Sequence, residues 1–163
     1  MTSYASHRYI IPANPKNWKA NLRFVNELLR RDFLVEWVLR TFNVHTLGSV
    51  NEKKPTTYPA DSFLVEIPND RNSSTNISEF LEKASSHKIK TIEIQGPAKI
   101  KTLKLNTSVV GLFANGGSPF PFAPILAEVG IEHVPLSVDD INNGGLRGVR
   151  SSILESTAAT LLE

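Results

Sequence analysis

Short apolar runs typical of β-strands alternate along this chain with segments of helical periodicity, and this alternation limits its possible folds more than any other feature. The strand-like runs cover residues 9–12, 33–42, 62–68, 90–95, 109–114 and 131–136. The segments between them predict helices that begin near residue 14, span 77–88 and 123–128, and begin again near residue 137. Strands that alternate with helices are usually joined by right-handed crossovers to parallel neighbours. The sequence therefore predicts an α/β fold with a mostly parallel sheet flanked by helices, in three layers.

The first predicted helix has a clear start and one apolar side. Asn14 is a suitable N-cap, and Pro15 fits the first helical position, where a missing N–H costs nothing. Basic residues in and before this helix either cover its solvated face or form a modest patch for an acidic partner. Apolar residues recur at helical spacing, which predicts a stripe that packs on the sheet: Trp18, Leu22, Val25 and Leu29.

The length of the chain and the order of its segments indicate how it divides. Its 163 residues, 40% of them hydrophobic, suit one compact domain or two small halves. Residues 43–57 are polar and aperiodic, which predicts an exposed loop. We expect an N-terminal α/β block at 1–104 and a second β-α-β block at 105–163, which can also form one continuous domain.

Composition excludes several classes of function. The 18 basic and 16 acidic residues give a net charge of +2, and the basic residues are scattered, so we expect no nucleic-acid partner. The chain has no cysteine, which excludes disulfides, thiolate metal sites and cysteine nucleophiles. No apolar stretch approaches the roughly 20 residues that span a bilayer, and no signal peptide is evident, so we expect a cytoplasmic protein without a membrane partner.

A glycine-rich turn follows the apolar run at 109–114. Asn115, Gly116, Gly117 and Ser118 stand between this strand and a predicted helix, where backbone N–H groups can hold a small anionic ligand. The alternative is structural, because glycines permit a tight turn and Ser118 can cap the helix. Neither dinucleotide-binding nor P-loop spacing is present, and we expect no cofactor.

The second block contains residues of the types found in serine triads and in cation sites, but their pattern does not favour either function. Ser118 could form a triad with His133 and Asp139 or Asp140, but Pro119 breaks the G-x-S-x-G pattern that this chemistry requires. Glu132, Asp139 and Asp140 could bind a divalent cation, although aspartates at a helix start are explained by capping. We therefore expect no catalytic residue and no metal site.

Aromatic residues follow the glycine-rich turn. Phe120 and Phe122 give the stretch an apolar character that is unusual for a loop. They either close the core or form a contact surface, since exposed aromatic clusters often mark interfaces. On this basis we expect a homo-oligomer or a protein partner.

The chain resembles two regions of a group of zinc carboxypeptidase-like proteins. "RYIIPANPKNWKANLRFVNELLRRDFLVEWV" and "TYPADSFLVEIPND" are similar to the segment that follows the catalytic domain in that group. "SVVGLFANGGSPFPFAPILAEVGIEHVPLSVDDINNGGLR" is similar to the opening of the class I glutamine amidotransferase-like domain that these proteins carry. The resemblance implies a flavodoxin-like or amidotransferase-like three-layer architecture.

The catalytic motifs of both families are missing. No histidine is followed three residues later by glutamate, so the zinc-binding pair of the carboxypeptidases is absent. The amidotransferase nucleophile cannot exist without cysteine. The resemblance thus implies a non-catalytic accessory or assembly domain that binds a protein or itself. The alternatives are an anion-binding or small-molecule-binding module at Gly116 and Gly117, and a divergent serine or metal hydrolase.

Overall fold

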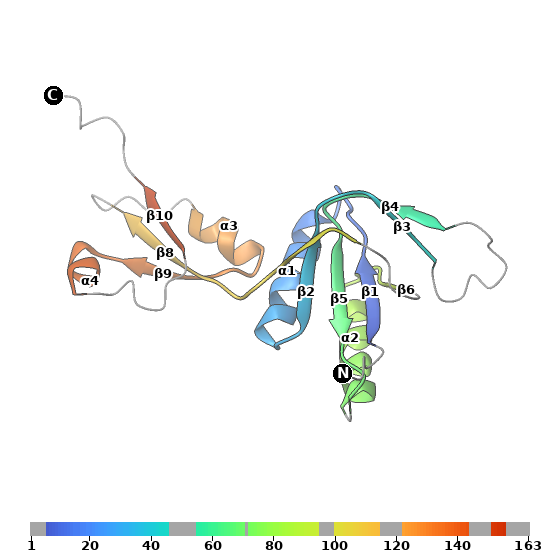
Figure 1. Ribbon diagram of the computed structural model, residues 1–163. Helices are drawn as coiled ribbons and strands as arrows, with labels where there is room; N and C mark the ends of the chain where they lie inside the picture. The colour runs from blue at the N-terminus through green and yellow to red at the C-terminus, as the bar shows by residue number, and fades with distance from the viewer. Residues whose placement is uncertain are drawn as a thin grey trace. The chain divides into compact units, whose positions relative to one another are not determined.

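The computed structural model describes residues 6–45, 55–70, 72–94, 100–114, 122–143 and 151–155 (Figure 1). The chain divides into two compact units, Met1–Asn106 and Thr107–Glu163. The boundary predicted from the sequence falls two residues earlier, after residue 104. Each unit contains its own sheet, and each is described by itself.

The N-terminal unit is built on a five-stranded antiparallel sheet. Its strands are β1 (His7–Ile11), β2 (Leu34–Val38), β5 (Phe63–Ile67), β6 (Ile92–Ile94) and β7 (Thr102–Lys104). They lie in the order β6-β1-β5-β2-β7, and every neighbouring pair is antiparallel. Two helices connect them, α1 (Trp18–Arg30) after β1 and α2 (Ser73–Ser86) after β5. If β7 is set aside, the other four strands and the two helices have the split β-α-β arrangement of ferredoxin-like folds.

The predicted fold, a mostly parallel sheet flanked by helices in a flavodoxin-like or amidotransferase-like three-layer architecture, is therefore wrong: the five-stranded sheet is antiparallel, and both of its helices pack on one face. Strands β1 and β2 do run in the same direction on either side of α1, as a crossover requires, but β5 lies between them and pairs with both. Strands β5 and β6 likewise run in the same direction before and after α2, and β1 lies between them and pairs with both. Strands and helices also alternate along the chain when the strands of one β-α-β unit lie between those of another. The alternation alone therefore does not distinguish a parallel sheet from this antiparallel one.

Both helices cover one face of this sheet (Figure 1). The aromatic ring of Phe80 on α2 is fully buried and lies 4.9 Å from the ring of Tyr9 and 6.0 Å from that of Phe24, measured between centroids. Side chains that alternate along the strands complete this core: Tyr9, Ile11, Val35, Phe63, Val65 and Ile67. The buried side of α1 consists of Asn21, Phe24, Val25, Leu28 and Leu29.

A two-stranded antiparallel hairpin covers the other face. Strands β3 (Phe42–Val44) and β4 (Thr56–Tyr58) overlap the two ends of the segment 43–57, which the sequence predicted as a loop. Phe42 and Tyr58 stack with centroids 5.7 Å apart and pack against Ile10, Val38, Leu64 and Ile94 of the sheet. The hairpin also reverses the chain between β2 and β5, which makes these strands antiparallel.

The C-terminal unit contains a parallel sheet. Its strands are β8 (Val109–Ala114), β9 (Glu132–Leu136) and β10 (Ser151–Glu155), in the order β10-β8-β9 with both pairings parallel. Helix α3 (Phe122–Glu128) connects β8 to β9, and α4 (Val138–Asn142) follows β9. Strand β10 lies in a segment where the sequence suggested no strand. Among the described residues, no helix has the length and apolar character to cross a membrane.

Candidate functional site

A pocket of about 350 Å³ lies in the N-terminal unit, where the start of α1 meets the sheet. It receives side chains from the β1–α1 connection, from α1, and from β2 and the start of β5. Its lining is mostly apolar, with three polar side chains, as is usual for ligand pockets. The lining residues are Ala13, Asn14, Pro15, Trp18, Asn21, Leu22, Trp37, Asp61 and Phe63.

The sheet side of the pocket is formed by Trp37 and Phe63. These residues are directly opposite each other on β2 and β5, so their side chains share the face that carries the helices. Phe63 is buried in the core, whereas 38% of Trp37 is exposed. On its other side Trp37 pairs with Leu103 of β7, which is also exposed. The apolar surface of this face therefore continues past the helices.

The helix side of the pocket is formed by the first turns of α1. Trp18 is the first residue of the helix and is 48% exposed, and Leu22 follows one turn later. The helix was predicted to begin at Asn14 and Pro15, but these residues form a turn instead, in which Asn14 Oδ1 accepts the N–H of Lys16 at 3.0 Å. Trp18 therefore stands at the first position of the helix, before the first buried residue, Asn21, and it lines the pocket.

Two buried polar side chains fix the loop beneath the pocket. Asn21 Nδ2 donates to the carbonyl oxygen of Pro12 at 3.1 Å. Ser62, which is fully buried, accepts the N–H of Ala13 at 3.0 Å and donates to the carbonyl oxygen of Pro59 at 2.9 Å. Buried polar groups are costly unless bonded, so these contacts hold the β1–α1 connection in one position.

Among the described residues that line the pocket, Asp61 is the one with an ionisable side chain. Its backbone is in the left-handed region, with φ 64°, which aspartate tolerates better than most residues. Its N–H donates to the carbonyl oxygen of Val38 at 2.9 Å, and its Oδ1 accepts the indole Nε1–H of Trp37 at 3.2 Å. Among the described residues, Asp61 forms no ion pair.

Positive charge lies close to the pocket on α1. The ammonium of Lys19 is 5.8 Å from the centroid of the Trp18 ring, within the range of a cation–π contact. The first turn of α1 contains no acidic residue, and its N-cap Asn17 makes no side-chain cap. The positive end of this helix therefore adds to the charge of Lys19 and opposes that of Asp61.

The predicted ligand-binding turn is not among the described residues. Asn115, Gly116, Gly117 and Ser118 lie outside them, as does Phe120. Phe122, the other predicted interface residue, is the first residue of α3 and is 40% exposed.

Asp140 and His133, two candidate residues of the C-terminal unit, bond to groups close to them in the sequence. Ser137 N–H and Oγ–H both donate to Asp140 Oδ2, at 2.8 and 2.6 Å, and Asp140 N–H donates back to Ser137 Oγ. These hydrogen bonds hold the pKa of Asp140 below its ordinary value. His133 Nδ1 donates to the carbonyl oxygen of Ile131 at 3.3 Å. In the described part of the chain, no group of side chains is arranged to hold a metal ion.

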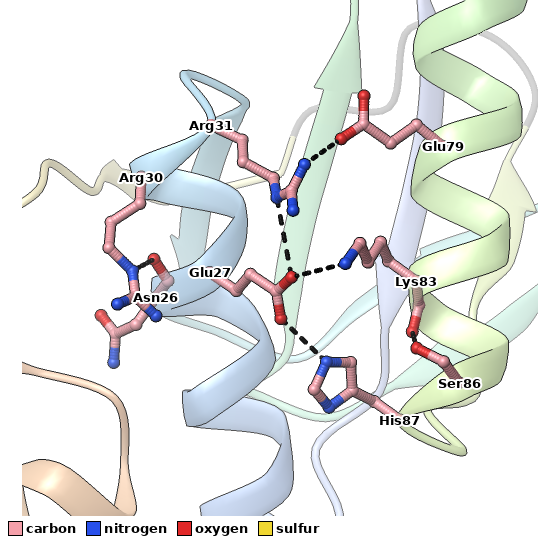
Figure 2. A network of polar contacts seen from close by, with 8 residues as sticks. All are labelled: Asn26, Glu27, Arg30, Arg31, Glu79, Lys83, Ser86 and His87. Carbon is pink, nitrogen blue, oxygen red and sulfur yellow. Dashed lines mark hydrogen bonds and ion pairs between the residues drawn. The ribbon is translucent and has the colours of Figure 1, made fainter.

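A second cluster of charged residues lies between the helices. Figure 2 shows Glu27 of α1 facing Lys83 and His87 at the end of α2, with Arg31 between Glu27 and Glu79. All five side chains pair with one another, so this cluster joins the two helices and offers no unpaired group to a ligand.

The pattern of the sequence does not predict the pocket. Trp37 was assigned only to a strand, and Asp61 was not considered. A signal was nevertheless present, since the chain has only two tryptophans and both of them line the pocket.

Comparison with models of protein families gives no match, and neither does comparison with curated proteins. Among solved structures, the chain is similar to a formyltetrahydrofolate deformylase from Pseudomonas putida KT2440, with 10% sequence identity and a TM-score of 0.22. The match covers 90% of this chain and 48% of that protein, so the chain spans about half of its length. A TM-score this low supports no conclusion about fold or activity.

Proposed function

We propose that the protein is a non-catalytic binding domain that takes its ligand in the pocket of the N-terminal unit. The observation that carries this proposal is that both tryptophans of the chain line one pocket with their rings partly exposed. Large exposed apolar groups that gather at one place on a protein often mark a binding site.

The framework of the pocket supports binding without a large rearrangement. Ser62 and Asn21 fix the loop at its base, and the hydrogen bond from Trp37 to Asp61 orients one of the two rings. A site that is already held in place loses less conformational entropy when a ligand binds.

The chemistry of the lining favours binding over catalysis. In the described lining of the pocket, the one ionisable group is Asp61, and the other polar side chains are the amides of Asn14 and Asn21. General acid–base and nucleophilic mechanisms need a reactive group with a partner within hydrogen-bonding distance. Asp61 instead has the indole of Trp37 as its partner.

Intrinsic tryptophan fluorescence tests this proposal, because the two tryptophans report on this pocket alone. We expect a screen of neutral, cationic and anionic small molecules to find ligands that change the emission and raise the unfolding midpoint. A ligand at ten times its Kd stabilises the folded unit by about 1.4 kcal/mol. Trp18→Ala should weaken this binding, and Leu81→Ala, at an exposed position on α2, should not. A screen in which no compound changes the emission would contradict the proposal.

The order of strands in the C-terminal unit favours a second candidate function, the binding of a small anion. Strand β8 is central, and its two parallel neighbours, β9 and β10, follow it in sequence. Ligands of open α/β sheets bind at the carboxyl ends of strands where the order reverses in this way. Gly116 and Gly117 follow this end of β8. Titration with inorganic phosphate should then shift the amide signals of Ala114 and Phe122, and unchanged signals would exclude this site.

The remaining sequence-based predictions belong to the same proposal. Exposed Phe122 supports a contact with a second copy or a protein partner. An accessory role of the amidotransferase-like kind and a cytoplasmic location are compatible with a binding domain. Light scattering across a range of protein concentrations tests self-association directly.

A further inference from the structure

We infer that the pocket binds a neutral carbohydrate, an inference that rests on the ligand-binding function proposed above. The occupant must match two partly exposed indole rings, a carboxylate with one oxygen that has no hydrogen-bond partner among the described residues, and nearby charges of opposite sign. A pyranose ring meets these three conditions, since it combines an apolar C–H face with hydroxyl groups around its edge.

The indole rings provide the apolar contact. Trp18 from α1 and Trp37 from β2 both line the pocket, with 48% and 38% of their surfaces exposed. Such rings offer a large, rigid apolar face at a low cost in conformational entropy. The C–H face of a sugar can lie flat against them. A volume of about 350 Å³ is at the small end for ligand pockets, which suits a mono- or disaccharide.

The polar groups of the pocket match hydroxyl groups. Asp61 Oδ1 accepts the indole N–H of Trp37, and the second carboxylate oxygen has no hydrogen-bond partner among the described residues. Asn14 Oδ1 accepts the backbone N–H of Lys16, and Nδ2 of Asn14 has no hydrogen-bond partner among the described residues. The site thus presents a charged acceptor and an amide donor. A hydroxyl group can both donate and accept, so vicinal hydroxyls satisfy both.

The charges around the pocket favour a neutral ligand. The carboxylate of Asp61 is opposed by the ammonium of Lys19 near Trp18 and by the uncapped positive end of α1. A cationic ligand would be attracted by Asp61 and repelled by Lys19, and an anionic ligand would be repelled by Asp61 and attracted by Lys19. A neutral ligand avoids both losses and still gains a charge-assisted hydrogen bond from Asp61.

Isothermal titration calorimetry on the full chain tests this inference with a defined panel. The panel contains cellobiose, maltose, lactose and N-acetylglucosamine as neutral sugars, with indole as a planar heterocycle and choline as an organic cation. We expect at least one sugar to bind about tenfold more tightly than indole and choline. Tighter binding of indole or choline than of any sugar would overturn the carbohydrate inference and leave the binding function intact. Binding of no panel member would also overturn the carbohydrate inference, whereas the binding function is overturned only if the fluorescence screen described above finds no ligand either.

Two conservative variants test the assigned contacts. Asp61→Asn keeps an acceptor for Trp37 Nε1 and a residue that tolerates the left-handed backbone, and it removes the charge. Asn14→Asp keeps the acceptor for Lys16 and removes the amide donor. Each should weaken sugar binding about tenfold with an unchanged far-ultraviolet circular dichroism spectrum. Asp70→Asn, outside the pocket, is the matched control and should bind as the wild type does. Unchanged sugar affinity in Asp61→Asn and Asn14→Asp would contradict the inference.

Discussion

His87 Nε2 lies 2.8 Å from Glu27 Oε2 and so ties the end of α2 to the last turn of α1 (Figure 2). The same carboxylate is 3.2 Å from the ammonium of Lys83 and 3.6 Å from Nε of Arg31. Burial acts to raise the pKa of Glu27, but its hydrogen bonds and charge interactions with Lys83 and His87 outweigh this and hold the pKa below its ordinary value. The ionised form of Glu27 is therefore stabilised by folding.

Glu27→Gln should lower the free energy of unfolding by about 1 kcal/mol at pH 7. A carboxyl whose pKa is lowered in the folded state stabilises the fold above its unfolded pKa, and this contribution is lost as the pH falls through the folded value. The difference between wild type and variant should therefore be full at neutral pH and disappear in acid. Urea unfolding at several pH values measures it. Glu82→Gln, on the exposed side of α2, is the control, and an equal effect there would contradict the assignment.

Phe80→Ala should destabilise the N-terminal unit by about 3–5 kcal/mol. The ring of Phe80 is fully buried and contacts the rings of Tyr9, Phe24 and Phe33. Its removal leaves a cavity that these neighbours cannot fill. Leu81→Ala, at the next position and 42% exposed, should change stability by less than about 0.5 kcal/mol. Chemical denaturation followed by tryptophan fluorescence compares them, and similar losses in both variants would refute the assigned core.

Ser62→Ala should cost about 1–3 kcal/mol of stability. The substitution leaves the N–H of Ala13 and the carbonyl oxygen of Pro59 without their present partner. Because Ala13 lines the pocket, we also expect ligand affinity to fall. Ser85→Ala on the exposed side of α2 serves as the control in the same unfolding experiment. A Ser62→Ala variant as stable as this control would show that the buried hydroxyl does not hold the loop.

Ser137→Ala should raise the pKa of Asp140 toward its ordinary value. The side chain and then the backbone N–H of Ser137 are the groups that lower this pKa, and the variant removes the first of them. Carbon-detected NMR titration of the aspartate carboxyls measures the change. An Asp140 that titrates identically in both proteins would mean that the cap of α4 is not formed.

The positions of most strands could be predicted from the sequence, but their pairing could not. Residues 62–68 and 109–114 were both predicted as strands, and β5 and β8 lie within these ranges. The two runs are similarly apolar, yet β5 is an antiparallel strand and β8 is the central strand of a parallel sheet. The choice depends on contacts between distant segments, here the insertion of β5 between β1 and β2.

The hairpin of β3 and β4 was missed for a related reason. Its strands are only three residues long, and much of their sequence is polar because one side is exposed. Phe42 and Tyr58 become buried only through the sheet face that they cover. The pocket was missed because Trp18 fits a helical stripe equally well. In the structure Trp18 is instead the first residue of α1 and lines the same pocket as Trp37.

The most direct test of the binding pocket is a ¹⁵N–¹H NMR titration of the full chain with cellobiose, repeated with indole. Trp18 and Trp37 supply the only two indole N–H signals of the protein, and single Trp→Phe variants assign them. We predict that both signals move together and saturate, with the amide of Asp61, while those of β8 and β9 stay in place. Indole signals that remain fixed in both titrations would contradict the account.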